Sequence, residues 1–393
     1  MEYSDRQIIN FRSADRTKYG RVDAPFVTLT ILLLLTGVMM VLSASFARAY
    51  YDSDKQATYY FIRQSFFALS GCVIMLIASR VPLDFYKRYS FLFFAGSIVL
   101  LALVLVAGTS ANGAKRWFSM GGISFQPSEI AKISVILFEA RIICAYKGKM
   151  HSFRYGVLPF ALVAVSVVGL LVLEPHLSAS IIILGATALM MFMGGTSLRW
   201  FFILGAVALL GLGIMAFGMD YSSDRISAWL DPFADSSDTG YQIVQSLYSI
   251  GSGGLSGLGL GQSRQKNLYL PEEHNDFIFA VVCEELGFIG AAAILCLFAM
   301  LIIRGFWLAM HCRDRYQFLV CAGISSLLAM QVILNVAVVT NLIPCTGISL
   351  PFFSYGGTAL WIQLGEIGII LSASRSIPEK SVVSSGYKIT SAT

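Results

Sequence analysis

Long apolar runs recur along the whole chain, and they limit its fold more than any other feature. Ten such runs approach the roughly 20 residues that a helix needs to cross a bilayer. Only 13% of the 393 residues are charged and 56% are hydrophobic, whereas a soluble domain is about 25% charged. The sequence therefore predicts an all-α fold, namely a polytopic membrane protein with ten transmembrane helices.

The predicted spans form one membrane domain with a short tail at each end. They cover residues 25–46, 60–79, 91–108, 128–146, 156–173, 177–193, 200–217, 277–303, 318–340 and 355–372. Residues 1–24 form the N-terminal tail, residues 25–375 the membrane domain and residues 376–393 the C-terminal tail. Residues 218–275 contain no clean apolar run of spanning length, so we expect a large loop between the seventh and eighth helices.

The distribution of Lys and Arg predicts how the helices are oriented. Ten spans place both termini on one side, and 19 Lys and Arg residues lie on that side. Eight lie on the opposite side, and Lys132 falls within a span. Because cytoplasmic loops carry the excess of Lys and Arg, we expect cytoplasmic termini and an external segment 218–275. The net charge of +5 reflects this asymmetry and does not indicate nucleic-acid binding.

Four ionisable side chains and an amide stand directly before the eighth predicted span: Glu272, Glu273, His274, Asn275 and Asp276. Acidic residues are favourable near a helix N-terminus, and such a capping role accounts well for Glu272 and Glu273. It explains Asp276 less well, because Asp276 lies deepest and is followed at once by Phe-Ile-Phe. Ionisable groups at membrane depth usually face a bundle interior or a water-filled cavity. Asp276 is therefore the first candidate for a functional residue.

Two adjacent cations, Lys115 and Arg116, stand beside Trp117 in the predicted outer loop 109–127. Aromatic and basic residues are common at a membrane surface, where they meet lipid headgroups. The functional interpretation is a site for a phosphate-bearing lipid. Glu129 and Lys132 are three residues apart in the next span, so we expect them to pair with each other in a structural role.

Two further outer segments have unusual composition. Arg225, Arg264 and Lys266 flank Asp276 in sequence, so these cations and the carboxylate are expected to share one outward cavity. The glycine-rich stretch 251–261 matches no nucleotide-binding pattern, and we interpret it as a flexible surface segment. Residues 341–354 interrupt an apolar stretch with Pro and Gly. Broken backbone is tolerated where it is buried in protein or lines a cavity, which predicts a re-entrant loop closing the outer mouth.

Together these segments resemble one family, the SEDS proteins (shape, elongation, division and sporulation), which include FtsW, RodA and sporulation relatives. The matching stretches are residues 112–117, 126–129, 241–261, 271–279, 284–287, 347–352 and 354–357. The likeness covers roughly residues 25–375. Glu174-Pro175-His176 departs from the family, which often has Gln-Pro-Asp at this place, and Asn275 is a milder departure beside an intact Asp276.

The resemblance implies a peptidoglycan glycosyltransferase in the bacterial cytoplasmic membrane. Its substrate would be lipid II, an undecaprenyl-diphosphate-linked disaccharide-peptide, which it would polymerise through β-1,4 linkages for cell division, elongation or spore cortex synthesis. Its partner would be a class B penicillin-binding protein, a transpeptidase, together with other membrane proteins of the divisome or elongasome. Asp276 matches the aspartate regarded as essential in the family. Two alternatives are a lipid II flippase and a non-catalytic scaffold for a transpeptidase.

Such a reaction needs a base for the acceptor 4-hydroxyl and positive charge for the departing diphosphate. Asp276 is the candidate catalytic base; the alternative makes it a ligand of a divalent cation such as Mg²⁺ or Mn²⁺. The candidate substrate-binding residues are Lys115, Arg116, Trp117, Arg225, Lys266, Glu272, Glu273, His274 and Ser354.

Overall fold

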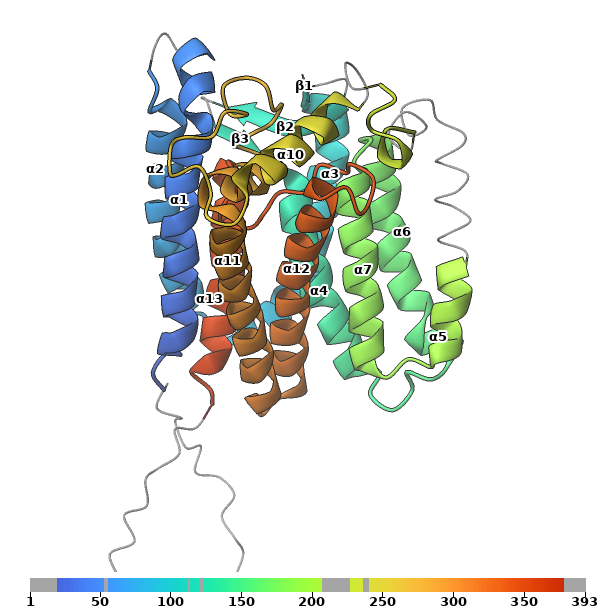
Figure 1. Cartoon of the computed structure of the whole chain (residues 1–393). Helices are drawn as coiled ribbons and strands as arrows, with labels where there is room; N and C mark the ends of the chain where they lie inside the picture. Colours follow the sequence, from blue (N-terminus) through green and yellow to red (C-terminus); the bar gives the residue numbers. More distant parts are fainter. Residues whose placement is uncertain are drawn as a thin grey trace, which may run out of the picture.

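A bundle of long helices makes up the protein (Figure 1), and the computed structural model describes residues 20–52, 56–111, 114–120, 123–206, 227–235 and 240–377. The helices are α1 (Ala24–Asp52), α2 (Tyr59–Ala78), α3 (Leu83–Ala107), α4 (Pro127–Ala145), α5 (Phe153–Gly156), α6 (Leu158–Leu173), α7 (Leu177–Gly194), α10 (Tyr241–Gly253), α11 (Ile278–His311), α12 (Arg315–Val339) and α13 (Gly357–Ser374). Within the described residues, eight helical segments are long and apolar enough to cross a membrane. The predicted helical membrane fold is confirmed, whereas the count of ten spans stays a prediction.

The fourth and seventh predicted spans account for the difference in count. α4 has only 19 residues and carries Glu129, Lys132 and Glu139, all buried. It packs against α3, α7 and α12, so these polar groups face protein rather than lipid. The seventh predicted span, residues 200–217, is helical as far as residue 206, and its remainder lies outside the described residues.

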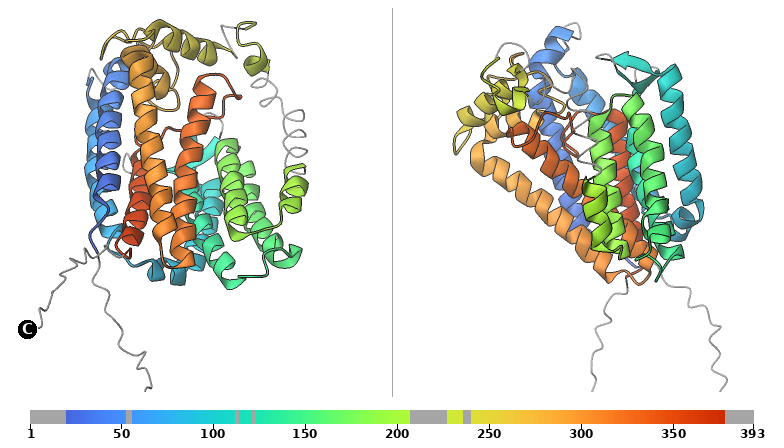
Figure 2. Two further views of the ribbon diagram at one scale, coloured as in Figure 1. Left: turned by 60° about the horizontal axis from the view of Figure 1, so that its bottom comes forward. Right: turned by 90° about the vertical axis from the view of Figure 1, so that its right-hand side faces the viewer.

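The two ends of the described chain lie side by side at one end of the bundle. The backbone N–H of Gly20 donates to the carbonyl of Arg375 (3.0 Å), and the N–H of Asp23 donates to Ser374 Oγ (3.3 Å). Helix α10 and a small sheet occupy the opposite end (Figures 1 and 2). Because both ends share one face, the chain between them makes an even number of crossings, in agreement with an even number of spans.

The small sheet lies in the connection between α3 and α4, which the sequence predicted as a loop. It consists of β1 (Thr109–Ala111), β2 (Ala114–Met120) and β3 (Ile123–Phe125), antiparallel in the order β1-β2-β3. Thr358 at the start of α13 donates to the carbonyl of Ser124 (2.9 Å) and ties the sheet to the bundle. Successive side chains of a strand point to opposite faces, which decides where the basic residues of β2 can act.

Helix α11 is interrupted at Gly287, where φ is +66° and ψ is −171°. Residues 278–286 form a largely buried half-helix, and the longer part of α11 follows the break. The eighth predicted span, residues 277–303, overlaps α11, which is apolar enough to cross a membrane, but its helix is interrupted at Gly287. Glycine is required because a Cβ at Gly287 would lie 2.2 Å from the backbone nitrogen of Gly257, and because this positive φ is costly for residues with a Cβ.

The glycine-rich stretch 251–261 packs directly into this break. The N–H of Phe288 donates to the carbonyl of Gly254 (2.9 Å), and the N–H of Leu258 donates to the carbonyl of Glu284 (3.0 Å). A Cβ at Gly257 would lie 2.2 Å from the carbonyl oxygen of Glu285. The stretch is largely exposed, as predicted for a surface segment, and its glycines also permit close approach of two backbones.

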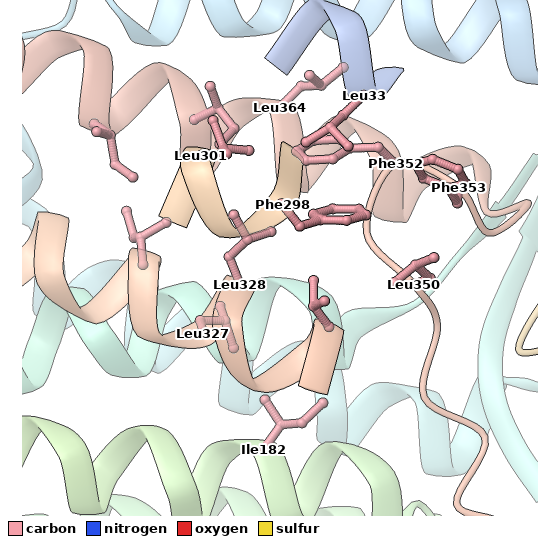
Figure 3. Packing of buried hydrophobic residues seen from close by; sticks show 14 of the residues in the cluster. Leu33, Ile182, Phe298, Leu301, Leu327, Leu328, Leu350, Phe352, Phe353 and Leu364 are labelled. Carbon is pink, nitrogen blue, oxygen red and sulfur yellow. The ribbon is translucent and has the colours of Figure 1, made fainter. Parts of the chain in front are cut away.

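A non-helical segment, residues 341–356, runs through the bundle between α12 and α13. Phe352 and Phe353 are buried, and their ring centroids lie 6.4 and 5.7 Å from that of Phe298. Figure 3 shows these rings with Leu33 of α1 and Leu364 of α13 beside them. The predicted interruption of the helical pattern over residues 341–354 is confirmed, and its role in closing the outer mouth stays a prediction.

Candidate functional site

A polar cavity of about 640 Å³ joins parts of the chain that are far apart in sequence. Its walls come from β2, β3, the start of α4, the link between α6 and α7, the segment 272–276 and the non-helical segment 341–356. The polar side chains in this lining include Arg116, Gln126, Glu129, Lys132, His176, Glu272, Asp276, Gln331, Ser354 and Gln363.

Asp276 lies in this cavity against the backbone of Gly347. A Cβ at Gly347 would lie 3.0 Å from Asp276 Oδ2, and Gly347 has a φ of +69°. The absence of a side chain at Gly347 thus leaves room for the carboxylate. Asp276 was expected at the start of a membrane span, but it precedes the buried half-helix 278–286. Its position therefore depends on the break at Gly287.

Two side chains hold the backbone on either side of the Asp276 carboxylate. Asn335 Nδ2 donates to the carbonyls of Asp276 (2.8 Å) and Ile348 (2.7 Å). Ser354 Oγ donates to the carbonyl of Asn275 (2.9 Å) and accepts from the N–H of Leu350 (2.7 Å). Ser354, a predicted substrate-binding residue, lines the cavity and also fixes this local backbone.

Glu273 and His274 lie behind the cavity and are not part of its lining. Glu273 Oε1 is 2.9 Å from Arg48 Nε and 3.7 Å from His274 Nδ1. The His274 ring packs on Tyr60, with 4.6 Å between centroids. Burial raises the pKa of Glu273, but its interactions with His274 and Arg48 outweigh burial, so this pKa lies below its ordinary value. The ion pair between Glu273 and Arg48 therefore connects the Asp276 segment to α1.

Glu272 lines the cavity and accepts a hydrogen bond from Asn275 Nδ2 (2.5 Å). Its φ is +55°, in the left-handed region. The first turn of α11 contains no acidic residue, and Phe277 precedes the helix without a side-chain cap. The expected capping role of Glu272 and Glu273 is therefore wrong, because the chain turns before the half-helix begins.

The two adjacent cations of β2 are separated by strand geometry. Arg116 lines the cavity, where its Nε donates to the carbonyl of Glu174 (3.1 Å) and its Nη2 to that of Pro175. Lys115 is exposed and is not part of the lining, whereas Trp117 is. The structure therefore does not bring Lys115 and Arg116 together as a pair at one site.

Lys266 and Arg264 lie in a second hollow, about 1050 Å³ in volume, between α1 and residues 260–267. Lys266 Nζ is 2.8 Å from Glu285 Oε1 and donates to Ser43 Oγ (3.1 Å). The expectation that these cations share one cavity with Asp276 is wrong, because the segment 267–275 turns between them. Arg225 lies outside the described residues.

Glu284 and Glu285 make hydrogen bonds to neighbouring helices. Glu284 accepts from Ser249 Oγ of α10 (3.0 Å), and Glu285 accepts from Ser43 Oγ of α1 (2.7 Å). Both acids end the half-helix just before Gly287. They fix that half-helix to α1 and α10, and so fix the segment that carries Asp276.

The predicted pair of Glu129 and Lys132 is confirmed, with 2.8 Å between Oε2 and Nζ. Both side chains also line the Asp276 cavity, which the sequence reasoning did not anticipate. The sequence did carry a sign of this location, because two ionisable residues inside a predicted span are by default candidates for a functional site. Gln331, Asn335 and Gln363 were likewise missed, since single amides in apolar helices carry no recognisable spacing.

The link between α6 and α7 contributes two buried ionisable groups beside Arg116. Burial raises the pKa of Glu174 to about 8, although Arg116 lowers it. Burial lowers the pKa of His176 to about 3, and Arg116 and Lys132 lower it further, so His176 is neutral at physiological pH. Within the described residues, neither carboxyl oxygen of Glu174 has a hydrogen-bond partner.

Two more acids, Glu139 and Glu366, are buried within α4 and α13 outside this lining. Thr187 Oγ1 donates to Glu139 Oε1 (2.8 Å). Across the described part of the chain, no group of three or more His, Cys, Asp or Glu residues is placed to hold a metal ion. Asp276 and Glu272 are the carboxylates that the cavity offers besides Glu129.

Comparison with known proteins adds a family and a fold. The sequence model of the cell cycle proteins FtsW, RodA and SpoVE matches residues 24–378. Stage V sporulation protein E of Bacillus subtilis is 40% identical over 361 residues, covering 91% of this chain and 98% of the relative. A probable peptidoglycan glycosyltransferase FtsW of a Geobacter species is 37% identical over 358 residues, covering 90% of this chain and 96% of the relative.

Solved structures agree with these matches. A chain from a structure described as structural coordination of polymerization and crosslinking by a peptidoglycan synthase complex is 29% identical, with a TM-score of 0.75; the match covers 91% of this chain and 99% of that one. The rod shape determining protein RodA of Thermus thermophilus is 28% identical, with a TM-score of 0.67, covering 91% of this chain and 98% of that one.

Proposed function

This chain belongs to the FtsW, RodA and SpoVE family of multi-pass membrane proteins, and we propose that it is a peptidoglycan glycosyltransferase that polymerises lipid II. One observation carries the proposal. The Asp276 carboxylate lies in a polar cavity whose lining also contains the cations Arg116 and Lys132. A carboxylate and cations in one cavity are what a glycosyl transfer with a diphosphate leaving group requires.

In this proposal Asp276 is the general base. The acceptor 4-hydroxyl oxygen attacks the anomeric carbon of the donor sugar while its proton passes to the Asp276 carboxylate. The bond between the anomeric carbon and the diphosphate oxygen breaks, and the diphosphate leaves with that electron pair. A positioned base typically contributes 10²–10⁴-fold to such a step. The Asp276 proton then returns to solvent through the cavity.

The departing diphosphate gains negative charge and needs positive groups that are already in place. Arg116 is held by the carbonyls of Glu174 and Pro175, so its guanidinium is ordered before substrate arrives. Lys132 is held by Glu129. We assign both cations to the diphosphate, and Trp117 and Glu272 to the sugar and peptide parts that share this cavity.

A divalent cation is the second way to supply positive charge. Mg²⁺ is commonly bound by one or two carboxylates together with substrate phosphates, so Asp276 with Glu272 would hold it only when the diphosphate is present. Such an ion would stabilise the leaving group electrostatically. In that version Asp276 is a metal ligand instead of the base.

We further propose cytoplasmic termini and a class B penicillin-binding protein as partner. The first rests on the bias in Lys and Arg. The second rests on the structural neighbour from a complex that couples polymerization to crosslinking. A single cysteine at Ser256, in a background without the seven native cysteines, tests the orientation. Labelling by an impermeant reagent in intact spheroplasts is expected, and labelling only after lysis would overturn this orientation.

The catalytic proposal is tested with purified protein and lipid II in detergent. Asp276→Asn keeps the shape of the side chain but removes its charge and basicity, so glycan strands should no longer form. Asp231→Asn is the matched control, because Asp231 is exposed and lies outside the cavity lining. Polymerisation at the wild-type rate by Asp276→Asn would overturn the assignment. Transport of lipid II across vesicles without polymerisation would indicate a flippase, and neither activity would indicate a scaffold.

A further inference from the structure

Asn335 of α12 is a buried polar side chain whose hydrogen bonds meet at the candidate site. It is 0% exposed, in the interior of a helix apolar enough to span the membrane. Its Nδ2 donates to two backbone carbonyls, of Asp276 (2.8 Å) and of Ile348 (2.7 Å). A buried amide is costly unless it is hydrogen-bonded; here both amide protons are used, and Oδ1 has no hydrogen-bond partner among the described residues.

The two carbonyls belong to segments that are distant in sequence and adjacent in space. One segment carries the Asp276 carboxylate. The other carries Gly347, whose Cβ position would lie 3.0 Å from Asp276 Oδ2. Asn335 therefore joins the two segments at the point where the Asp276 carboxylate packs on the backbone of Gly347.

Gly347 is held from both sides by different helices. Ser178 Oγ of α7 donates to the carbonyl of Thr346, and Asn335 of α12 donates to the carbonyl of Ile348. Of these two side chains, Asn335 is the one that also bonds the backbone of Asp276. Loss of the Asn335 amide would remove the direct tie between the Asp276 and Ile348 carbonyls, while Ser178 still held Thr346 and Ser354 still held Asn275.

We propose that Asn335 is a positioning residue that sets the place of the Asp276 carboxylate relative to the segment 346–348. It does not touch the reacting atoms; it acts through the backbone of Asp276. The functional consequence rests on the proposed glycosyl transfer, whereas the structural consequence does not. A misplacement of about 1 Å at a reacting group can cost about 10²-fold in rate, so a comparable fall in kcat is expected without a change in KM for lipid II.

The test compares Asn335→Asp with Asn341→Asp. Each change replaces one amide with a carboxylate of the same shape. Asn341 Nδ2 also donates to a backbone carbonyl, that of Trp229 (3.2 Å), but Asn341 is outside the cavity lining. Asn335→Asp should lower kcat by about 10²-fold, and Asn341→Asp should leave it unchanged. Added to Asp276→Asn, the Asn335 change should have no further effect on rate.

A second measurement does not depend on activity. Labelling of carboxyl groups with a water-soluble carbodiimide and an amine, read by mass spectrometry, reports how each carboxylate is presented. Asn335→Asp should change the labelling of Asp276 and leave that of Glu273 and Glu284 unchanged, whereas general loosening would change all three. If Asn335→Asp does not fold, Asn335→Gln can replace it, because it keeps the amide but displaces it by one methylene. A lower kcat and a changed labelling of Asp276 are again expected.

The outcomes separate this proposal from the proposed function. If the wild-type protein polymerises lipid II and a folded Asn335 variant keeps the wild-type kcat, the positioning role is overturned. Unchanged Asp276 labelling in folded Asn335 variants overturns it as well. If the wild-type protein forms no glycan but Asp276 labelling changes selectively, the glycosyltransferase proposal fails while the positioning of Asp276 by Asn335 stands.

Discussion

Two hollows in the described part of this protein are lined by neighbouring stretches of one segment, residues 260–276, and they hold different sets of charged groups. In the hollow beside α1, Lys266 is bound by Glu285 and Ser43. In the cavity of Asp276, the carboxylate lies against the backbone of Gly347, and Arg116 donates to backbone carbonyls. The hollow beside α1 holds the Lys266–Glu285 pair, whereas the cavity of Asp276 holds the Glu129–Lys132 pair together with Asp276, Glu272 and Arg116 in one lining.

This difference shows how to separate structural from functional charge in a membrane protein. Breaking a buried ion pair is costly because the remaining charge has no compensation. A charge that lines a polar cavity is accessible to water and to ligand, so its removal should affect chemistry more than folding. Closeness in sequence to a candidate catalytic residue does not distinguish the two cases, as Lys266 and Asp276 demonstrate.

The largest effect is expected from breaking the paired hollow. Lys266→Met leaves Glu285 buried without its cation and should reduce the free energy of unfolding by about 3–5 kcal/mol. The activity of the remaining folded molecules should persist. Thermal unfolding and lipid II polymerisation per folded molecule check both parts. Lys266→Met combined with Glu285→Met is the control and should recover much of the stability. A loss of activity at unchanged stability would instead assign Lys266 to substrate.

The next effect is expected in the cavity. Arg116→Gln removes a positioned cation from the leaving group, and removal of one such group typically costs about 10²–10³-fold in kcat. Stability should change little, because Arg116 donates to two backbone carbonyls of the link between α6 and α7. Steady-state rates at several salt concentrations provide the measurement. A wild-type kcat for Arg116→Gln would contradict the leaving-group role and would favour an interaction of Arg116 with lipid headgroups instead.

A smaller effect with a defined pH dependence is expected at Glu174. Burial raises its pKa from 4.5 to about 8, so between these values the folded state binds more protons than the unfolded state. Stability contributed by this group therefore falls as pH rises across that window. Glu174→Gln should remove the dependence and gain about 1–3 kcal/mol at the alkaline end, the usual cost of a buried unsatisfied group. Parallel thermal unfolding curves for the two proteins at all pH values would contradict this.

The smallest effect is expected at Lys115, the neighbour of Arg116 on β2. Its side chain is exposed and outside the cavity lining, and such substitutions usually change stability by less than about 0.5 kcal/mol. Lys115→Gln should therefore match the wild-type protein in kcat, KM and melting temperature. It serves as the control for Arg116→Gln, and a rate loss equal to that of Arg116→Gln would mean that the two cations act together after all.

The sequence predicted the helical membrane fold well because apolar length is a local property. The bounds of α2, α7 and α12 lie within three residues of their predictions. The break at Gly287 was not predicted, since apolar residues continue on both sides of it and only the facing backbone of Gly257 explains the glycine. The small sheet of residues 109–125 was missed because its strands are short and half-exposed.

The candidate site was predictable where a motif marked it and not where packing decided it. Asp276 stood out through its position before an apolar run, and it lies in a cavity that is also lined by Arg116 and Lys132. Lys266 was grouped with it wrongly, because sequence distance does not show which side of a segment a side chain occupies. Asn335 could not be found, since its role arises from two carbonyls that meet only in the folded chain.

The contact between Gly257 and Gly287 has a consequence for how this protein can evolve. A side chain at either position meets the backbone of the other segment, at 2.2 Å in both cases. Most steric defects can be rescued by a smaller residue at the facing position, but here the facing residue is already the smallest. A library screen for second-site revertants of Gly257→Ala should therefore recover true revertants and no change at Gly287. A substitution at either glycine is therefore expected to disrupt the contact, and no substitution at the other glycine can restore it.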